Sequence, residues 1–387
     1  MRLSASTLID EKVFSVHADL RHEFCYNNKG DTMELRWLGD TGLRVSSFSL
    51  GTMGFGGAAR GGWVGAIDQD EAIRHVSMAI DMGVNMFDTA DSYSNGESEV
   101  MLGRAVSSRR DSVLISTKVH SRSGEGPNDV GQSRWHLVQG CEASLRRLGT
   151  DHIDIYHVHG FDGCTRLDET LEGLNDLVRS GKVRYIACSN HAAWQVMKAI
   201  GISRENRWSR FVAFQGYYSL VGRDIENDIL PLCRDQGLGV FVWSPLAGGF
   251  LSGKFSPDQP PEAGTRRSFV GDLGVGVIDP DRGFAVVQVL RDIAAERNVS
   301  PSQVALNWVR RNSDVTSVIV GARTAEQLQD NLNASTWQLT DEEYQRLNRT
   351  SAVTTPYPQW FQRQFTAERY SKAGAPDDAF NYDFSND

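Results

Sequence analysis

At 387 residues the chain is long enough for one large domain or two. Its 40% hydrophobic and 23% charged residues are typical of an ordinary globular protein, and no apolar run approaches the ~20 residues needed to cross a bilayer. The net charge of -9 disfavours binding to nucleic acid or to an anionic membrane, although a local basic pocket can still hold a phosphate.

The five cysteines are scattered along the chain and form no CxxC pair. They are Cys25, Cys141, Cys164, Cys188 and Cys233. An odd number without paired spacing indicates reduced thiols in a cytoplasmic protein, rather than a disulfide framework or a zinc site. No other metal-ligand spacing is present, so no metal site is predicted.

Well-patterned sequence begins at residue 34 and ends near residue 350, and these residues are expected to form one domain. Residues 1–33 contain no signal-peptide apolar stretch and predict a loosely ordered arm. Residues 351–387 are rich in Pro, Gln, Phe, Tyr and Asp without a helical or strand period, which predicts an irregular tail.

Within this domain, residues 34–37 and 44–47 flank a Gly-Asp-Thr-Gly turn and predict a hairpin. From residue 48 onward, buried-strand patterns alternate with helical ones. The expected strands are residues 48–51, 84–88, 112–118, 153–159, 183–189, 211–215, 239–244 and 316–320. The helices that follow them are expected at 68–82, 98–107, 133–147, 168–179, 192–200, 224–236, 283–297 and 324–333, with a further one at 302–311.

This alternation, counted from Phe48, predicts an α/β protein built as a closed (β/α)8 TIM barrel with an N-terminal β-hairpin and extra helices. A doubly wound open sheet is the alternative. The first strand–helix loop, residues 51–57, lacks the GxGxxG pattern of the dinucleotide sites in such sheets, which disfavours that alternative.

Polar side chains stand at the ends of the expected strands, where a barrel keeps its chemistry. They are Asp88, Tyr93, Lys118, His159, Ser189, Asn190, Gln215, Trp243 and Ser244. Each alone has a plain structural explanation, such as a satisfied core histidine or a solvated lysine. Their recurrence at the same point of successive units favours one functional site.

The first four of these residues suit the chemistry of a carbonyl group. Lys118, held by Asp88, would place a cation beside the Tyr93 hydroxyl and lower the pKa of that phenol toward working pH. His159 would orient a carbonyl oxygen and donate a hydrogen bond toward it. No side chain supplies a hydride, whereas a nicotinamide cofactor would.

The remaining strand ends offer groups that fit a nicotinamide. Ser189, Asn190 and Gln215 carry the donors and acceptors that a carboxamide needs. Trp243 offers a flat face on which the ring can stack. The sequence therefore predicts a nicotinamide-dependent site.

Six stretches carry a resemblance to a known family. They are Phe-Asp-Thr-Ala-Asp-Ser-Tyr at 87–93, Ser-Thr-Lys-Val at 116–119, Asp-Ile-Tyr-His-Val-His at 154–159, Gly-Lys-Val-Arg-Tyr-Ile-Ala-Cys-Ser-Asn at 181–190, Trp-Ser-Pro-Leu-Ala-Gly-Gly-Phe-Leu-Ser-Gly-Lys at 243–254, and Gly-Ala-Arg-Thr-Ala-Glu-Gln-Leu-Gln-Asp-Asn at 321–331. In order and spacing they resemble the aldo-keto reductases over essentially all of residues 34–350. The resemblance implies a catalytic tetrad of Asp88, Tyr93, Lys118 and His159.

The resemblance also implies an NADPH site. Its nicotinamide end would involve Thr52, Met53, Asp88, Ser189, Asn190, Gln215 and Trp243. Its diphosphate loop would involve Ser244, Pro245, Leu246, Ala247, Gly248, Gly249, Leu251 and Lys254, and its adenosine-phosphate pocket Gly321, Arg323, Gln327 and Asn331. Arg266 is a weaker candidate from a loop that resembles a cofactor-covering segment.

This chain departs from the family pattern at three positions. Val320 stands where many relatives have a proline before the glycine of the adenosine loop, and Gly216 removes a side chain that some relatives carry. His157 shares a strand face with His159 by period, and the catalytic role is assigned to His159, which is nearer the strand end.

The function predicted from these residues is NADPH-dependent reduction of an aldehyde or ketone to an alcohol, and its reverse, with Tyr93 as the general acid. The expected partner is a small-molecule carbonyl substrate, with neither nucleic acid nor membrane, and the oligomeric state stays open. The alternative is a cofactor-binding regulatory subunit, because the stretch at 243–247 also resembles potassium-channel β-subunits, which are relatives within the same family.

Overall fold

The computed structural model describes residues 33–57, 66–256 and 278–370. Eight parallel strands close into a barrel in the order β10-β3-β4-β5-β6-β7-β8-β9, and the predicted (β/α)8 fold is therefore confirmed. The strands are β3 (Phe48–Gly51), β4 (Met86–Asp88), β5 (Leu114–Val119), β6 (Ile153–Val158), β7 (Val183–Ser189), β8 (Phe211–Tyr217), β9 (Gly239–Trp243) and β10 (Ser317–Val320).

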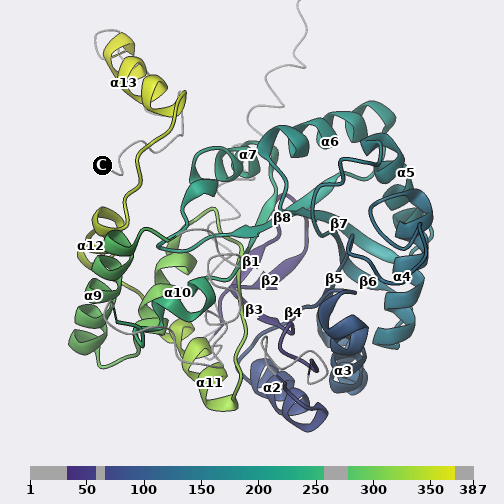
Figure 1. The fold of residues 1–387 in the computed structure, drawn as a ribbon, viewed down its shortest axis with the longest axis horizontal. Coiled ribbons are helices and arrows are strands. Elements are labelled where there is room, and N and C mark those ends of the chain that lie inside the picture. The colour runs from purple at the N-terminus through teal and green to yellow at the C-terminus, as the bar shows by residue number, and fades with distance from the viewer. Residues whose placement is uncertain (1–32, 58–65, 257–277, 371–387) are drawn as a thin grey trace, which may run out of the picture.

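Helices surround the barrel as an outer ring (Figure 1). They are α2 (Gln69–Asp81), α3 (Glu97–Val106), α4 (Arg134–Leu148), α5 (Leu167–Arg179), α6 (Ala193–Asn206), α7 (Ile229–Gln236), α9 (Pro280–Arg297), α10 (Pro301–Arg311), α11 (Ala325–Asn333) and α12 (Asp341–Thr350). Apolar stripes on these helices meet the outer faces of the strands, which are almost fully buried. Among the described residues, no helix is both long and apolar enough to cross a membrane.

A two-stranded hairpin closes the barrel floor. Its strands, β1 (Leu35–Trp37) and β2 (Arg44–Ser46), pair antiparallel as predicted. Leu38 and Val45 are fully buried within a small apolar cluster. The strand residues in that cluster are Met86, Ile155, Ala187, Ala213, Phe241 and Ile319.

This floor fixes what lies above it, because alternate residues of a strand share a face. Three site residues each lie two positions after a floor residue on the same strand. Asp88 follows Met86, Ser189 follows Ala187, and Gln215 follows Ala213. The apolar floor therefore positions the polar strand ends as the next layers of the same barrel interior.

The prediction of an irregular tail after residue 351 was wrong for part of its length. Residues Gln359–Tyr370 form a helix, α13, which stands apart from the ring of helices in Figure 1. Phe361 and Phe365 are spaced four residues apart, but the other aromatic residues of this segment do not continue that spacing, so the sequence shows no sustained helical period. Residues 371–387 lie outside the described residues, and the domain boundaries stay predictions.

One predicted helix is shorter than expected. The segment 224–236 divides into a 3-10 turn, η4 (Asp224–Glu226), and α7. Asp228, the residue before α7, interrupts the helix with φ of -132° and ψ of -42°.

Candidate active site

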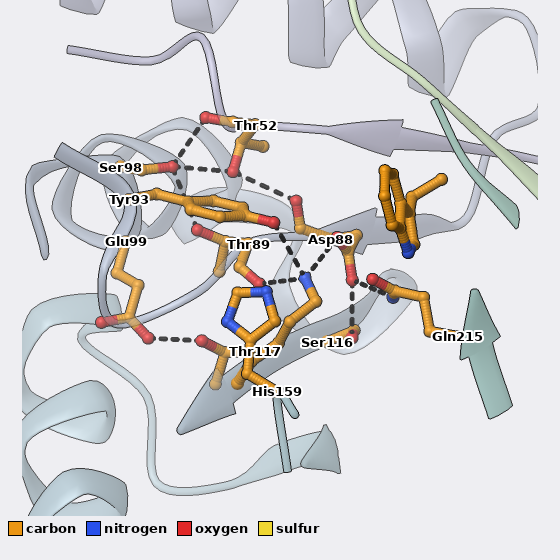
Figure 2. A network of polar contacts seen from close by, with 12 residues as sticks. Thr52, Asp88, Thr89, Tyr93, Ser98, Glu99, Ser116, Thr117, His159 and Gln215 are labelled. Atoms are coloured by element: carbon orange, nitrogen blue, oxygen red, sulfur yellow. Dashed lines mark hydrogen bonds and ion pairs between the residues drawn. The ribbon is translucent and has the colours of Figure 1, made fainter. Parts of the chain in front are cut away.

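Asp88 and Lys118 form a buried ion pair in the barrel interior (Figure 2 shows the Asp88 end of it). Lys118 Nζ donates to Asp88 Oδ2 at 2.6 Å and to the backbone oxygen of Thr89 at 2.7 Å. Asp88 Oδ1 also accepts from Ser116 Oγ at 3.0 Å and from Gln215 Nε2 at 2.9 Å. Two strands, β5 and β8, thus supply three side-chain donors to one carboxylate, which offsets the cost of burying it.

The same contacts keep Lys118 charged. Burial alone would lower the pKa of Lys118, but the negative charge and hydrogen bond of Asp88, together with the Tyr93 oxygen, raise its pKa above the ordinary value. The lysine side chain is 0% exposed, so its cation acts without screening by water.

Tyr93 meets this cation from the loop after β4. Lys118 Nζ lies 3.5 Å from the Tyr93 hydroxyl oxygen and 5.0 Å from the centre of its ring. Tyr93 begins a tight turn, η2 (Tyr93–Gly96), in which Ser94, Asn95 and Gly96 all have positive φ. Non-glycine residues rarely adopt that conformation, so the surrounding structure must hold the turn in place.

His159 follows β6 directly, and its ring lies edge-on to that of Tyr93 with centroids 5.9 Å apart. Burial, with the positive charge of Lys118 next in importance, lowers the pKa of His159 to about 3. The imidazole is therefore neutral at physiological pH and can donate one N–H without carrying charge. Figure 2 shows it beside Asp88 and Tyr93.

The other histidine of this strand lies deeper. His157 is fully buried, with its ring edge-on to Phe241 at 6.1 Å. Burial and the charge of Lys118 lower its pKa well below the ordinary value. His157 therefore packs within the barrel interior, and the catalytic role of His159 stays a prediction.

Sequence reasoning missed several residues that shape this site. Ser116 lies two residues before Lys118 on the same strand face, so the period was a sufficient signal. Thr89 contributes a backbone oxygen, for which a sequence carries no signal. Tyr217 lies over Trp243 with ring centroids 5.1 Å apart, and it follows from the same alternation along β8.

The residues predicted to hold a nicotinamide carboxamide surround this centre. Asn190 Nδ2 donates to the His159 backbone oxygen at 2.9 Å, and Trp243 Nε1 donates to Asn190 Oδ1 at 3.1 Å. Ser189 is buried, and its hydroxyl has no hydrogen-bond partner among the described residues. A buried hydroxyl without a partner is costly, so Ser189 fits a ligand that supplies one.

Thr52 and Met53 directly follow β3, and Thr52 contacts Asp88. Thr52 donates both its backbone N–H and its hydroxyl to the Asp88 backbone oxygen, at 2.9 and 3.2 Å. Ser98 Oγ in turn lies 2.8 Å from the Thr52 hydroxyl (Figure 2). Thr52 is fully buried, whereas Met53 is partly exposed.

The predicted diphosphate loop follows β9. It forms a turn, η5 (Ala247–Ser252), with positive φ at Gly248 and Gly249. An ideal Cβ on Gly249 would lie 3.7 Å from Lys254 Nζ. The Lys254 ammonium group therefore lies next to the glycine backbone of this loop. The other predicted members belong to the same short segment: Ser244, Pro245, Leu246, Ala247 and Leu251.

The residues predicted to hold the adenosine phosphate lie in α11 and in the turn before it. The Arg323 backbone N–H donates to Gln327 Oε1 at 3.1 Å, and the Gln327 N–H donates to the Thr324 cap at 3.3 Å. Asn331 Nδ2 donates to the Gly321 oxygen at 3.4 Å. All four predicted residues are brought together, whereas Arg266 lies outside the described residues.

The described residues contain no group of three or more His, Cys, Asp or Glu side chains that could hold a metal ion. The donor set consists instead of one cation, one phenol and one neutral imidazole. Such a set can polarise and protonate a carbonyl oxygen, and the groups around it fit a nicotinamide.

Comparisons with known proteins identify the family of this chain. The profile of the Aldo/keto reductase family matches residues 48–352. The chain is 40% identical over 329 residues to the uncharacterized oxidoreductase YrpG of Bacillus subtilis (strain 168), a match that covers 82% of this chain and 95% of that protein.

Two further relatives show the breadth of the family. A versiconal hemiacetal acetate reductase of Aspergillus parasiticus is 32% identical over 84% of this chain and 99% of its own length. A putative voltage-gated potassium channel subunit beta of Schizosaccharomyces pombe is 35% identical over 77% of this chain and 87% of its own. The chain belongs to the aldo/keto reductase family, whose members are oxidoreductases that act on carbonyl compounds.

Proposed function

We propose that this protein reduces an aldehyde or ketone to an alcohol, and catalyses the reverse reaction, with NADPH as the hydride donor and Tyr93 as the general acid. The observation that supports this most strongly is the position of Lys118 Nζ, 2.6 Å from Asp88 Oδ2 and 3.5 Å from the Tyr93 hydroxyl. A fully buried cation at that place stabilises a phenolate, which is what a tyrosine becomes after giving up its proton.

The family generally uses nicotinamide cofactors, and such a cofactor supplies a hydride to the carbonyl carbon when bound. As the carbonyl oxygen gains negative charge, the Tyr93 hydroxyl donates its proton to it. His159, neutral at working pH, donates an N–H to the same oxygen and fixes its position. Lys118 then balances the charge left on Tyr93, which regains a proton from water.

The choice of NADPH over NADH rests on Arg323. Its side chain is exposed at the N-terminus of α11, where the backbone N–H groups and the helix dipole favour an anion. A guanidinium there suits the 2′-phosphate that only NADPH carries. In an otherwise acidic chain, Lys254 adds positive charge near the diphosphate loop.

The direct test is steady-state oxidation of NADPH by the purified protein with a panel of aldehydes and ketones. We expect carbonyl-dependent oxidation that is lost in Tyr93→Phe, while NADPH binding, followed by tryptophan fluorescence, is retained. Trp243→Phe is the control that assigns the fluorescence signal. Activity that persists at more than a tenth of the wild-type rate in Tyr93→Phe, with chemistry rate-limiting, would rule out Tyr93 as the acid.

The cofactor preference has its own measurement. The ratio of dissociation constants for NADPH and NADH should favour NADPH in the wild-type protein and move toward one in Arg323→Ala. Equal binding of both cofactors by wild type, or an unchanged ratio in the variant, would remove Arg323 from that role.

A docking role of the potassium-channel β type is the alternative. Its support is the similarity to proteins with that printed name, including the 35% identity described above. The tetrad geometry supports turnover directly, so we do not favour it. A protein that binds NADPH but oxidises it with no member of the carbonyl panel would reverse this preference.

A further inference from the structure

Behind the Tyr93 turn lies a group of buried charged side chains that the mechanism above does not use. Asp91 comes two residues before Tyr93 in the same loop and is 5% exposed. Glu99 of α3 is fully buried, and Arg147 of α4 reaches in to meet it. The loop after β4, α3 and α4 thus contribute two carboxyl groups and one guanidinium whose charges interact.

The two carboxyl groups have very different surroundings. Glu99 Oε1 accepts from Thr117 Oγ1 at 2.5 Å, which Figure 2 shows, and Glu99 Oε2 accepts from Arg147 Nε at 2.6 Å. Neither oxygen of Asp91 receives a well-formed hydrogen bond from any described residue. The Arg147 guanidinium therefore pairs with Glu99, and the Asp91 carboxyl group has no hydrogen-bond partner among the described residues.

An ionised carboxylate in that position is unfavourable. Burial first, and then the negative charge of Glu99, raise the pKa of Asp91 to about 7. Arg147, the nearby Ser92 backbone N–H and Lys118 act in the opposite direction but do not cancel the rise. Asp91 is consequently protonated below neutral pH and charged above it.

The other titratable groups that face this cluster do not change charge near neutral pH. Burial raises the pKa of Tyr156 on β6 well above its ordinary value, and raises the pKa of Cys141 on α4 to about 12. Lys118 on β5 has a raised pKa and stays a cation. Asp91 is the group in this cluster whose charge changes near pH 7.

The backbone joins Asp91 directly to the catalytic residues. Its N–H donates to the backbone oxygen of Lys118 at 3.2 Å, and the Tyr93 N–H donates to the Ala90 oxygen at 3.2 Å. Arg147 also packs against the turn itself, because an ideal Cβ on Gly96 would lie 2.7 Å from Arg147 Cδ. A change of charge at Asp91 therefore acts within the segment that presents Tyr93.

We propose that Asp91 is a positioning residue whose carboxyl group must be neutral for full reductase activity. This rests on the proposed function, in which Lys118 strengthens Tyr93 as an acid. A negative charge on Asp91 would offset the effect of the Lys118 cation, since the two charges interact. It would also place a second anion beside Glu99 under a turn that is already strained.

The sign of the effect follows directly. Below about pH 7 the carboxyl is neutral and Lys118 acts fully on Tyr93. Above it the ionised carboxyl makes Tyr93 a weaker acid, so kcat/KM for carbonyl reduction should fall through a step near neutral pH.

The test compares pH profiles of kcat/KM for NADPH-dependent reduction in four proteins. Asp91→Asn keeps the shape of the neutral acid and should lose the step near pH 7. Glu99→Gln removes the neighbouring anion and frees Arg147, so the step should move by about one unit to lower pH. Arg147→Met removes the cation and should move it by about one unit to higher pH. A merely structural role for this cluster would not move the step in opposite directions.

A second readout does not depend on turnover. The infrared carbonyl stretch of a protonated carboxyl, identified with 13C-labelled aspartate, should be present at about pH 6 in the wild-type protein and absent at about pH 8. It should be missing at both pH values in Asp91→Asn. This measurement stands even if Glu99→Gln or Arg147→Met fails to fold.

The inference is overturned if the step survives in Asp91→Asn, or if infrared spectra show Asp91 ionised at about pH 6. In either case the proposed function stands, because the wild-type protein still reduces carbonyls and Tyr93→Phe does not. Failure of the proposed function would differ, with no carbonyl-dependent oxidation of NADPH at any pH.

Discussion

At the scale of single residues, Lys118 shows how much of this site a sequence can specify. Lys118 lies near the end of one strand and Asp88 at the end of the neighbouring strand, which was sufficient to predict their pair and the proximity of Lys118 to Tyr93. The sequence does not predict the further donors to Asp88, because Gln215 also suits a cofactor amide and Ser116 is an ordinary strand residue. One side chain can serve both a buried carboxylate and a ligand, and residue types alone do not distinguish these roles.

Replacing Lys118 should separate its catalytic contribution from its structural one. Lys118→Met removes the cation beside Tyr93, and we expect the reduction rate to fall by roughly 10²–10⁴-fold. It also leaves the buried Asp88 carboxylate without its cation, which should lower the free energy of unfolding by about 3–5 kcal/mol. Adding Asp88→Asn should return part of that stability without restoring activity. Urea unfolding and NADPH oxidation measure the two effects, and recovery of reductase activity in the double variant would contradict the role given to Lys118.

The lowered pKa of His159 predicts how the stability of the protein depends on pH. Its pKa of about 3 in the folded protein lies below the ordinary value of 6.5, so the unfolded chain binds a proton that the folded protein does not between those pH values. The contribution of His159 to stability is therefore full above about pH 6.5 and decreases as the pH falls toward 3. His159→Asn should make the melting temperature less dependent on pH in that window. Other buried histidines keep some dependence, and a slope equal to wild type would mean that His159 is protonated in the folded protein.

At the scale of elements, the turn η2 is the part of the site that propensity alone would not produce. Ser94 and Asn95 adopt φ of 50° and 58°, and Gly96 adopts 89°. Ser94 Oγ donates to the Phe55 backbone oxygen at 3.0 Å, which ties the turn to the loop after β3. The sequence predicted a loop here, but its geometry depends on contacts with segments distant along the chain.

Gly96→Ala tests whether this turn positions Tyr93. The added methyl meets the Arg147 side chain, and φ of 89° is unfavourable for alanine. We expect the variant to lose about 1 kcal/mol or more of stability and to reduce carbonyls more slowly, with cofactor binding retained. Gly201→Ala is the matched control, because Gly201 lies in α6 with nothing near its Cβ position and should gain about 0.5–1 kcal/mol. Full activity in Gly96→Ala would show that the turn tolerates displacement.

Two elements near the C-terminus were not predicted, for different reasons. α12 begins with a capping box, in which Thr340 accepts from the Glu343 N–H and Glu343 accepts from the Thr340 N–H. That signal was present in the sequence, and searching for caps as well as apolar period would have found the helix. α13 has no such signal. Among the described residues, the Gln359 side chain of α13 donates hydrogen bonds to Asn227 and Asp228. A helix with few contacts to the barrel needs no apolar stripe, so its sequence shows no helical pattern.

At the scale of the whole molecule, the barrel was predictable because two independent patterns agree. Strands and helices alternate along the chain, and the polar residues of the candidate site recur at the C-terminal ends of successive strands. The hairpin that closes the barrel floor explains why the site lies at the other end of the barrel. Leu38 and Val45 fill the opposite end with an apolar cluster, so only the C-terminal end of the barrel interior is free for polar groups.

A single-turnover experiment with NADPH deuterated at the transferred position tests directly whether Tyr93 is the general acid. In the wild-type protein, hydride transfer to an aldehyde should show an isotope effect and require Tyr93 as the proton donor. Tyr93→Phe should bind NADPH with similar affinity and transfer hydride roughly 10²–10⁴-fold more slowly. Hydride transfer in Tyr93→Phe at a rate within tenfold of wild type, with the same isotope effect, would contradict the assignment of Tyr93 as the general acid.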